Sequence, residues 1–178
     1  DLNILAQSAT AYNVYIDPGN IKSNEKREVL VNGLSEILDF DDDEKEDLEE
    51  KAKKDTRYVV VEDKVDNDLK DEIVKFSNEN NFSQVIGYEQ TTKRYYPYNS
   101  FASSVLGFTG ADDQGLSGLE SYYNEQLTGT NGRIITAKDA KSNNLPSDYE
   151  TSIEATDGNS LVLTINQTIQ YYLEKGMS

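Results

Sequence analysis

The stretch from Arg94 to Gly132 decides the fold, and it reads RYYPYNSFASSVLGFTGADDQGLSGLESYYNEQLTGTNG. It holds more than half of the chain's eleven glycines and one of its three prolines, Pro97. Glycine adopts a positive φ without strain, and proline pushes the residue before it toward an extended conformation. Frequent glycines between short apolar runs therefore predict short helices joined by tight turns.

The glycine blocks are expected to separate two short helices and a strand. Asn99 or Ser100 is placed to cap the first helix, which Gly107 ends in the left-handed conformation. Ser117 and Glu120 match the S-x-x-E pattern of a capping box for the second helix. Apolar side chains then share a face on each helix: Phe101, Val105 and Leu106 on the first, and Leu119, Tyr123 and Leu127 on the second. Gly129 closes the second helix, and the turn residues 131–132 precede an expected strand at 133–136.

Four blocks of this stretch together resemble the N-terminal, non-catalytic module of class B penicillin-binding proteins, often called the dimerisation or pedestal domain. They read R-Y-Y-P-Y-x-x-x-A, V-L-G-F-x-G, Q-G-x-x-G-L-E and L-x-G-x-x-G-R, in matching order and spacing. Residues 5–18 resemble the start of that module, and residues 158–170 resemble its end. The resemblance covers nearly the whole chain and is weak between about residues 21 and 86. One departure is Asn166, where the family pattern has Asp, and either residue caps a helix.

The resemblance implies structural and interaction residues rather than catalytic ones. These are Arg94, Tyr96, Pro97, Gly107, Gly110, Gly115, Gly118, Glu120, Gly129, Gly132 and Arg133. We expect Glu120 to bond at least one of Arg94 and Arg133, because bidentate arginine suits such a charge-assisted network. The local alternative leaves Glu120 in its capping box and the arginines in solvent.

Composition excludes several classes of protein. The chain has 33 acidic and 17 basic residues, a formal charge of −16 that repels nucleic acids and anionic lipids. It has no cysteine and no histidine, which excludes disulfides, thiolate metal sites and the commonest general base. No apolar run approaches the length of a membrane span. We expect no cofactor and no metal.

Two letter matches to transpeptidase motifs are interpreted as chance. Ser23 and Lys26 give S-x-x-K, and residues 142–144 give S-N-N, but no K-T-G or K-S-G exists in the chain. A catalytic serine needs a desolvated lysine beside it, and Lys26 sits among polar neighbours. This chain is therefore not expected to react with β-lactams. The acidic runs 41–44 and 112–113 lack EF-hand spacing and are interpreted as solvated, and the tyrosines as half-buried packing rather than a sugar platform.

Periodicity predicts the remaining elements, and we expect a strand at 9–16 and a helix of about fifteen residues beginning at Ser23 or Asn24. An acidic helix at 44–55 has only Leu48 and Ala52 on its apolar side. The other expected elements are a strand at 57–61, a helix from Asp66 or Asn67, a strand at 84–88, a turn at 157–158 followed by a strand at 160–165, and a final helix. Asn166 caps that helix, with Ile169, Tyr172 and Leu173 on its buried side.

The predicted fold class is α+β, with an elongated mixed base of short strands and helices and an inserted small helical head lobe. Residues 1–21 and 88–178 form the base, and residues 22–87 form the head. The base is expected to hold the denser apolar packing. The head is expected to be the more mobile part, because its second helix buries little.

The resemblance implies a non-catalytic pedestal that positions a transpeptidase domain and makes protein contacts in peptidoglycan synthesis. Implied partners are that transpeptidase domain, a membrane-embedded glycan polymerase and a second copy of the module. The implied location is the extracytoplasmic face of the bacterial cell membrane, with the anchor and the transpeptidase domain outside this chain. The alternative is a module that binds cell-wall glycan or peptide. An independent enzyme would lack a histidine and a convincing nucleophile.

Overall fold

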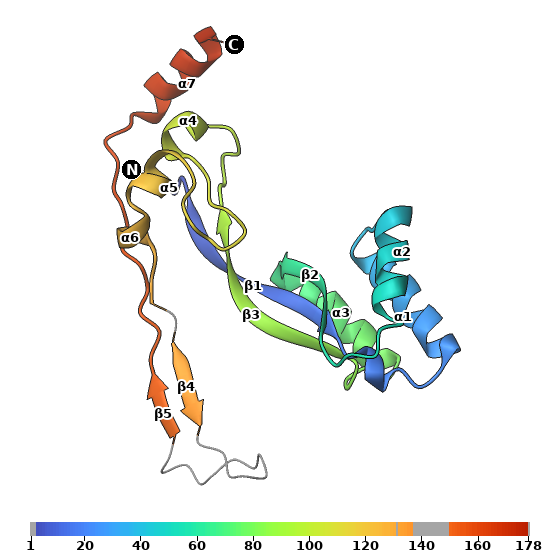
Figure 1. Ribbon diagram of the computed structural model, residues 1–178. Helices are drawn as coiled ribbons and strands as arrows, with labels where there is room; N and C mark the ends of the chain where they lie inside the picture. The colour runs from blue at the N-terminus through green and yellow to red at the C-terminus, as the bar shows by residue number, and fades with distance from the viewer. Residues whose placement is uncertain (1–2, 131, 137–149, 178) are drawn as a thin grey trace. The chain divides into compact units, whose positions relative to one another are not determined.

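The computed structural model of the 178-residue chain describes residues 3–130, 132–136 and 150–177 (Figure 1). The chain divides into two compact units. One unit, Ala6–Tyr95, is called the core unit below. The other, Asp1–Leu5 with Tyr96–Ser178, is called the glycine unit. The described elements include both helices and antiparallel strands, so the α+β class is confirmed.

The core unit is built on a three-stranded antiparallel sheet with β1 at its centre (Figure 1). The strands are β1 (Gln7–Ile16), β2 (Val59–Val65) and β3 (Ile86–Tyr95). The helical elements are the short 3-10 turn η1 (Pro18–Asn20), α1 (Asn24–Ile37), α2 (Asp42–Lys51) and α3 (Asn67–Glu79). β1 pairs with β3 along its whole length, from Gln7 opposite Tyr95 to Ile16 opposite Ile86. It pairs with β2 only from Tyr12 onward, with irregular register on either side of Val14.

Periodicity places the helices of the core unit well. α3 packs against β1 and α1 against α3, so Leu30, Leu34 and Ile73 are fully buried. Gly33 lies at this helix contact, because a Cβ there would overlap the Phe76 ring. The acidic α2 buries only Leu48 and adds Ala52 just after its end, as its sequence predicts. Low helix propensity at Gly33 is thus offset by close packing.

Two helix caps of the core unit come from polar side chains. The Ser23 hydroxyl accepts a hydrogen bond from the Lys26 backbone N–H at 3.2 Å, which confirms the predicted cap of α1. Asp41 and Glu44 form a reciprocal capping box at the start of α2, with N···O distances of 2.9 and 3.0 Å. This box satisfies two backbone donors that the first helical turn would otherwise leave open.

The glycine unit consists of short elements. They are α4 (Ser103–Leu106), α5 (Gly118–Tyr122), α6 (Asn124–Leu127), β4 (Arg133–Thr136), β5 (Glu150–Ile153) and α7 (Gln167–Met177). β4 and β5 form a two-stranded antiparallel ladder, which confirms the strand predicted at 133–136. Asn166 caps α7 through its side chain, which accepts the Ile169 N–H at 3.1 Å.

Four sequence predictions for the glycine unit are wrong. α4 begins at Ser103 after Ala102, whose own φ is 52°, so neither Asn99 nor Ser100 caps it. Ser117 precedes α5 without a side-chain cap, so the predicted capping box is not formed, and Glu120 is buried. Residues 160–165 form no strand and join no ladder. The supposed buried side of α7 is exposed, with Ile169 60%, Tyr172 67% and Leu173 55% accessible.

The apolar core also lies in the unexpected part of the chain. Every buried residue of the main hydrophobic cluster belongs to the core unit. In the glycine unit Leu106 is buried, while Leu119, Tyr123 and Leu127 are only partly buried. The prediction of denser apolar packing in the base is therefore wrong. The proposed head, residues 22–87, falls inside the core unit, and its status as a separate mobile lobe stays a prediction.

Candidate functional site

The residues singled out by the resemblance gather mainly in the turns of the glycine unit, where backbone contacts backbone. Gly107 has φ +79° and Gly118 has φ +58°. A Cβ on Gly107 would overlap the Ser117 carbonyl group, and a Cβ on Gly118 would overlap the Val105 carbonyl oxygen. These two turns therefore pack against each other at a distance that no other residue type allows.

Gly115 and Glu120 form a second backbone contact. A Cβ on Gly115 would overlap the Glu120 carbonyl group, and the Gly115 N–H donates to the Asn124 side chain at 2.8 Å. The Glu120 side chain is 6% exposed, and its Oε1 accepts a hydrogen bond from the Tyr96 hydroxyl at 3.4 Å. The Glu120 carboxylate thus binds Tyr96, the residue immediately before Pro97.

A third backbone contact involves Gly129 and a residue absent from the predicted site, Gly158. Cβ atoms on these glycines would overlap the Thr156 and Leu127 carbonyl oxygens, respectively. Reciprocal backbone hydrogen bonds of 2.7 and 2.9 Å join Thr130 and Thr156 beside them. The G-x-x-L pattern that begins at Gly158 could have marked this residue, but the pattern does not reveal its partner segment around Leu127, which is distant in sequence.

A second contact missed by sequence reasoning links α4 and α7. The Ala102 N–H donates to the Glu174 carboxylate at 2.8 Å, and the Gln170 side chain donates to the same oxygen at 2.7 Å. Ala102 is fully buried and has a left-handed backbone. Neither residue belongs to a pattern that marks such a contact.

The remaining predicted residues occupy varied places. Arg94 lies on β3 and donates to the Ser8 hydroxyl at 3.2 Å. Gly110 donates to the Gln114 carbonyl at 2.8 Å, while Pro97 and Gly132 are exposed in turns or loops. Arg133 begins β4, and its side chain lies outside the described residues. The predicted bond from Glu120 to Arg94 or Arg133 stays a prediction.

The S-x-x-K match has a structural explanation. The Ser23 hydroxyl accepts the Lys26 backbone N–H and caps α1, and both residues are exposed. That hydroxyl is therefore occupied as a cap, away from the desolvated lysine that a serine nucleophile requires. The S-N-N match at 142–144 lies outside the described residues.

The acidic helix α2 is a solvated face with local ion pairs. Lys51 pairs with Asp47 at 2.8 Å and Lys53 with Glu49 at 2.7 Å, each one helical turn away. Hydrogen bonds from Lys51 and Lys53 lower the pKa of Asp47 and of Glu49, respectively. Exposed pairs of this kind contribute little to stability. Among the residues that the structure describes, none of the helices is both long and apolar enough to cross a membrane.

Comparison with known proteins identifies the family. A family model described as the penicillin-binding protein dimerisation domain matches residues 1–163. The chain belongs to this family. As a dimerisation domain it is non-catalytic, whereas its full-length relatives include D,D-transpeptidases.

Curated relatives of the dimerisation domain are class B penicillin-binding proteins. Stage V sporulation protein D of Bacillus subtilis is 40% identical over 46% of this chain and 13% of its own length. The probable peptidoglycan D,D-transpeptidase PenA of Neisseria gonorrhoeae is 27% identical over 94% of this chain and 28% of its own length. The chain therefore spans less than a third of the length of these relatives.

Solved structures share the fold of the dimerisation domain. Penicillin-binding protein 2X of Streptococcus thermophilus matches 98% of this chain and 28% of its own, with TM-score 0.62 and 25% identity. In the complex of PBP2 with MreC from Helicobacter pylori, one chain matches 97% of this chain, and the match covers 35% of that chain's own length. That match has TM-score 0.62 and 22% identity, so it bears on the fold alone.

Proposed function

We propose that this dimerisation domain is the pedestal of a class B penicillin-binding protein and positions a transpeptidase domain for peptidoglycan cross-linking. It acts at the extracytoplasmic face of a bacterial membrane, and its surfaces bind other proteins of wall synthesis. The observation that carries the proposal is an exposed apolar strip on the segment 161–173.

The strip consists of large apolar side chains that are exposed to solvent in this chain. Its members are Leu161, Val162, Ile169, Tyr171, Tyr172 and Leu173, with exposures from 38% to 69%. Soluble domains rarely leave such a run of large apolar side chains uncovered. The relatives are several times longer than this chain, which supports a neighbouring domain of the same protein as the cover.

Protein partners are supported at a coarser level. The family description names dimerisation, and one solved relative of this fold is a complex of PBP2 with MreC. We propose a membrane-embedded glycan polymerase and a second copy of this protein as further partners. The charge of −16 favours partner surfaces rich in lysine and arginine.

The test places a charge in the strip and compares two contexts. Val162→Asp is made in the full-length protein and in the isolated domain, with Tyr122→Asp as the matched control. Tyr122 belongs to the same unit, is 77% exposed and lies outside the strip. We expect Val162→Asp to lower the melting temperature and transpeptidase activity of the full-length protein while leaving the isolated domain unchanged.

If Val162→Asp and Tyr122→Asp gave the full-length protein the same melting temperature and the same transpeptidase activity, the proposed contact of the strip with a neighbouring domain would be contradicted. The alternative function, a module that binds cell-wall glycan or peptide, predicts a different result. Under that alternative the isolated domain co-sediments with purified peptidoglycan, and under the pedestal proposal it stays in the supernatant.

A further inference from the structure

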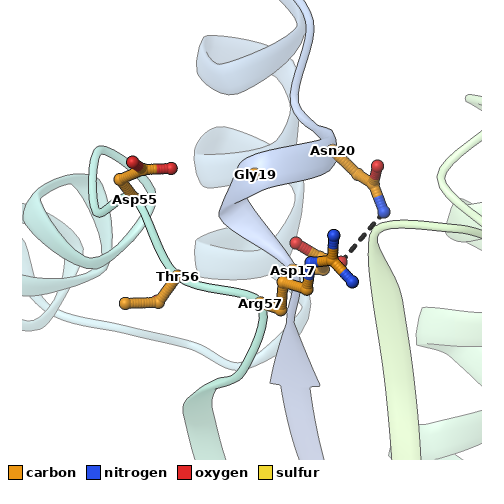
Figure 2. Close-up of a pocket in the computed structure, with 6 residues that line it drawn as sticks. All are labelled: Asp17, Gly19, Asn20, Asp55, Thr56 and Arg57. Atoms are coloured by element: carbon orange, nitrogen blue, oxygen red, sulfur yellow. Dashed lines mark hydrogen bonds between the residues drawn. The ribbon is translucent and has the colours of Figure 1, made fainter. Parts of the chain in front are cut away.

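A polar cavity in the core unit has no role in the pedestal proposal. It has a volume of about 460 Å³ and is lined by Asp17, Gly19, Asn20, Asp55, Thr56 and Arg57 (Figure 2). These residues come from η1 and from the segment that leads into β2. The volume falls in the range of small-molecule sites.

Backbone hydrogen bonds fix the walls of this cavity. The Asp17 N–H donates to the Val85 carbonyl at 2.7 Å, and the Gly19 N–H donates to the Thr56 carbonyl at 3.2 Å. The Asn20 amide donates to Asp17 Oδ2 at 2.9 Å, as the dashed line in Figure 2 marks. The two walls are therefore joined to each other before any ligand arrives.

Asp17 supplies a carboxylate oxygen without a partner. While Oδ2 accepts from Asn20, Oδ1 is inaccessible to solvent and has no hydrogen-bond partner. A buried acceptor left unsatisfied costs about 1–3 kcal/mol, and the negative charge of this carboxylate attracts an ammonium group in the cavity through space. Asp55, exposed on the same cavity, adds a second negative charge.

Arg57 supplies the opposite charge. Its side chain lines the cavity and is exposed, and it makes no hydrogen bond or ion pair with any residue that the structure describes. An arginine guanidinium binds a planar carboxylate through two parallel hydrogen bonds. The two carboxylates would repel a simple anion, and the Arg57 guanidinium would repel a ligand that carries only positive charge.

We propose that this cavity binds a free diamino acid. The ligand carboxylate lies on Arg57, and its ammonium groups lie toward Asp17 and Asp55. Two carboxylates and one guanidinium match two ammonium groups and one carboxylate charge for charge. This proposal is independent of the pedestal contact, because the strip and the cavity belong to different units.

The experiment titrates the isotopically labelled domain with four probes and follows backbone amide resonances. The probes are lysine, cadaverine without the carboxylate, aminocaproate without the α-ammonium group, and a tripeptide that ends in lysine. We expect saturable shifts at residues 17–20 and 55–57 with lysine, and at least fivefold weaker binding of cadaverine and aminocaproate. The tripeptide should bind about as weakly as aminocaproate, because its terminal lysine has a peptide bond in place of the α-ammonium group.

Substitutions separate the cavity from general electrostatics. Arg57→Gln is expected to weaken lysine binding about tenfold, as loss of a charged hydrogen bond predicts. Lys54→Gln removes the same charge nearby, but Lys54 does not line the cavity, so binding should stay within twofold. Asp55→Asn is expected to weaken lysine more than aminocaproate.

Three results would overturn the proposal. The first is the absence of saturable binding by lysine. The second is equal weakening by Arg57→Gln and Lys54→Gln. The third is a lower melting temperature of Arg57→Gln combined with no ligand binding by the unsubstituted domain. That result would show that Arg57 stabilises the Asp17 carboxylate within the protein.

Discussion

The two units bury different kinds of atoms. In the core unit, side chains such as Leu30, Leu34 and Phe82 are excluded from water and contact one another. In the glycine unit, carbonyl groups and glycine Cα atoms from separate turns meet directly. The core unit should therefore be sensitive to the loss of side-chain volume, and the glycine unit to its gain.

Leu34→Ala should have the largest effect, because it removes a fully buried side chain from α1. We expect a loss of about 2–5 kcal/mol in the free energy of unfolding of the core unit. Hydrogen exchange resolved by residue measures the effect, with faster exchange in β1 and α1 and little change in α5. Val29→Ala, at 45% exposure on the same helix, serves as control and should change stability by less than about 0.5 kcal/mol. Faster exchange spread equally over both units would contradict the division.

Gly107→Ala should destabilise the glycine unit by about 3 kcal/mol, combining overpacking against Ser117 with strain at positive φ. Gly176→Ala is the control, because a Cβ there meets nothing within 4 Å and α7 gains a better helix former. The control should be stabilised by about 0.5–1 kcal/mol. Thermal unfolding measures both variants. Changes in stability of opposite sign would support the view that the glycine unit is sensitive to added volume at its backbone contacts, and two variants as stable as the parent would contradict it.

Glu120→Gln tests the buried carboxylate of the glycine unit. Loss of the charged acceptor for Tyr96 should cost about 1–3 kcal/mol. The predicted bond to Arg94 or Arg133 would raise the cost to about 3–5 kcal/mol, because an arginine would lose its buried partner. Urea unfolding of Glu120→Gln, Tyr96→Phe and the double variant measures the coupling. A single variant indistinguishable from the parent would contradict both values.

Tyr88 gives the core unit a mild sensitivity to alkaline pH. Burial raises the pKa of Tyr88 to about 12, with a weaker opposing effect from the nearby Ser77, which is not placed to make a hydrogen bond of normal geometry with the Tyr88 hydroxyl. The folded state therefore holds the proton more tightly than the unfolded state, so stability is full below about pH 10 and falls as pH rises toward 12. Tyr88→Phe should remove this contribution and cost little at neutral pH, since the hydroxyl is buried without a hydrogen-bond partner. Melting temperatures between pH 8 and pH 12 compare the variant with the parent; identical slopes would contradict the assignment.

Sequence reasoning succeeded where the determinants are local. The apolar spacing of α1 and the cap at Ser23 both act within a few residues, and both are confirmed. It failed where the partner is distant. The pattern Ser117-x-x-Glu120 suits a capping box, but burial beside Tyr96 takes the carboxylate away from the helix start.

The same limit explains the other errors. Alternation at 160–165 predicts a strand, which is not observed, because alternation contains no information about which strand would lie beside it. The glycine positions predicted turns, and two of the turns need positive φ. The contacts that make Gly115 and Gly158 necessary involve other segments of backbone, and no single-sequence pattern reveals them.

The position of β1 in its sheet has a consequence for synthesis of the chain. The central strand is made first, yet its partner β3 ends only at Tyr95, and their paired residues are 70 to 88 positions apart. Both edges of β1 therefore lack a partner while α1 and α2 are synthesised, and the edge that pairs with β3 still lacks one while α3 is synthesised. Long-range pairing of this kind folds slowly and leaves strand edges open to association. The edge of β1 that pairs with β3 should therefore stay open to association until Tyr95 has reached the compartment in which the domain folds.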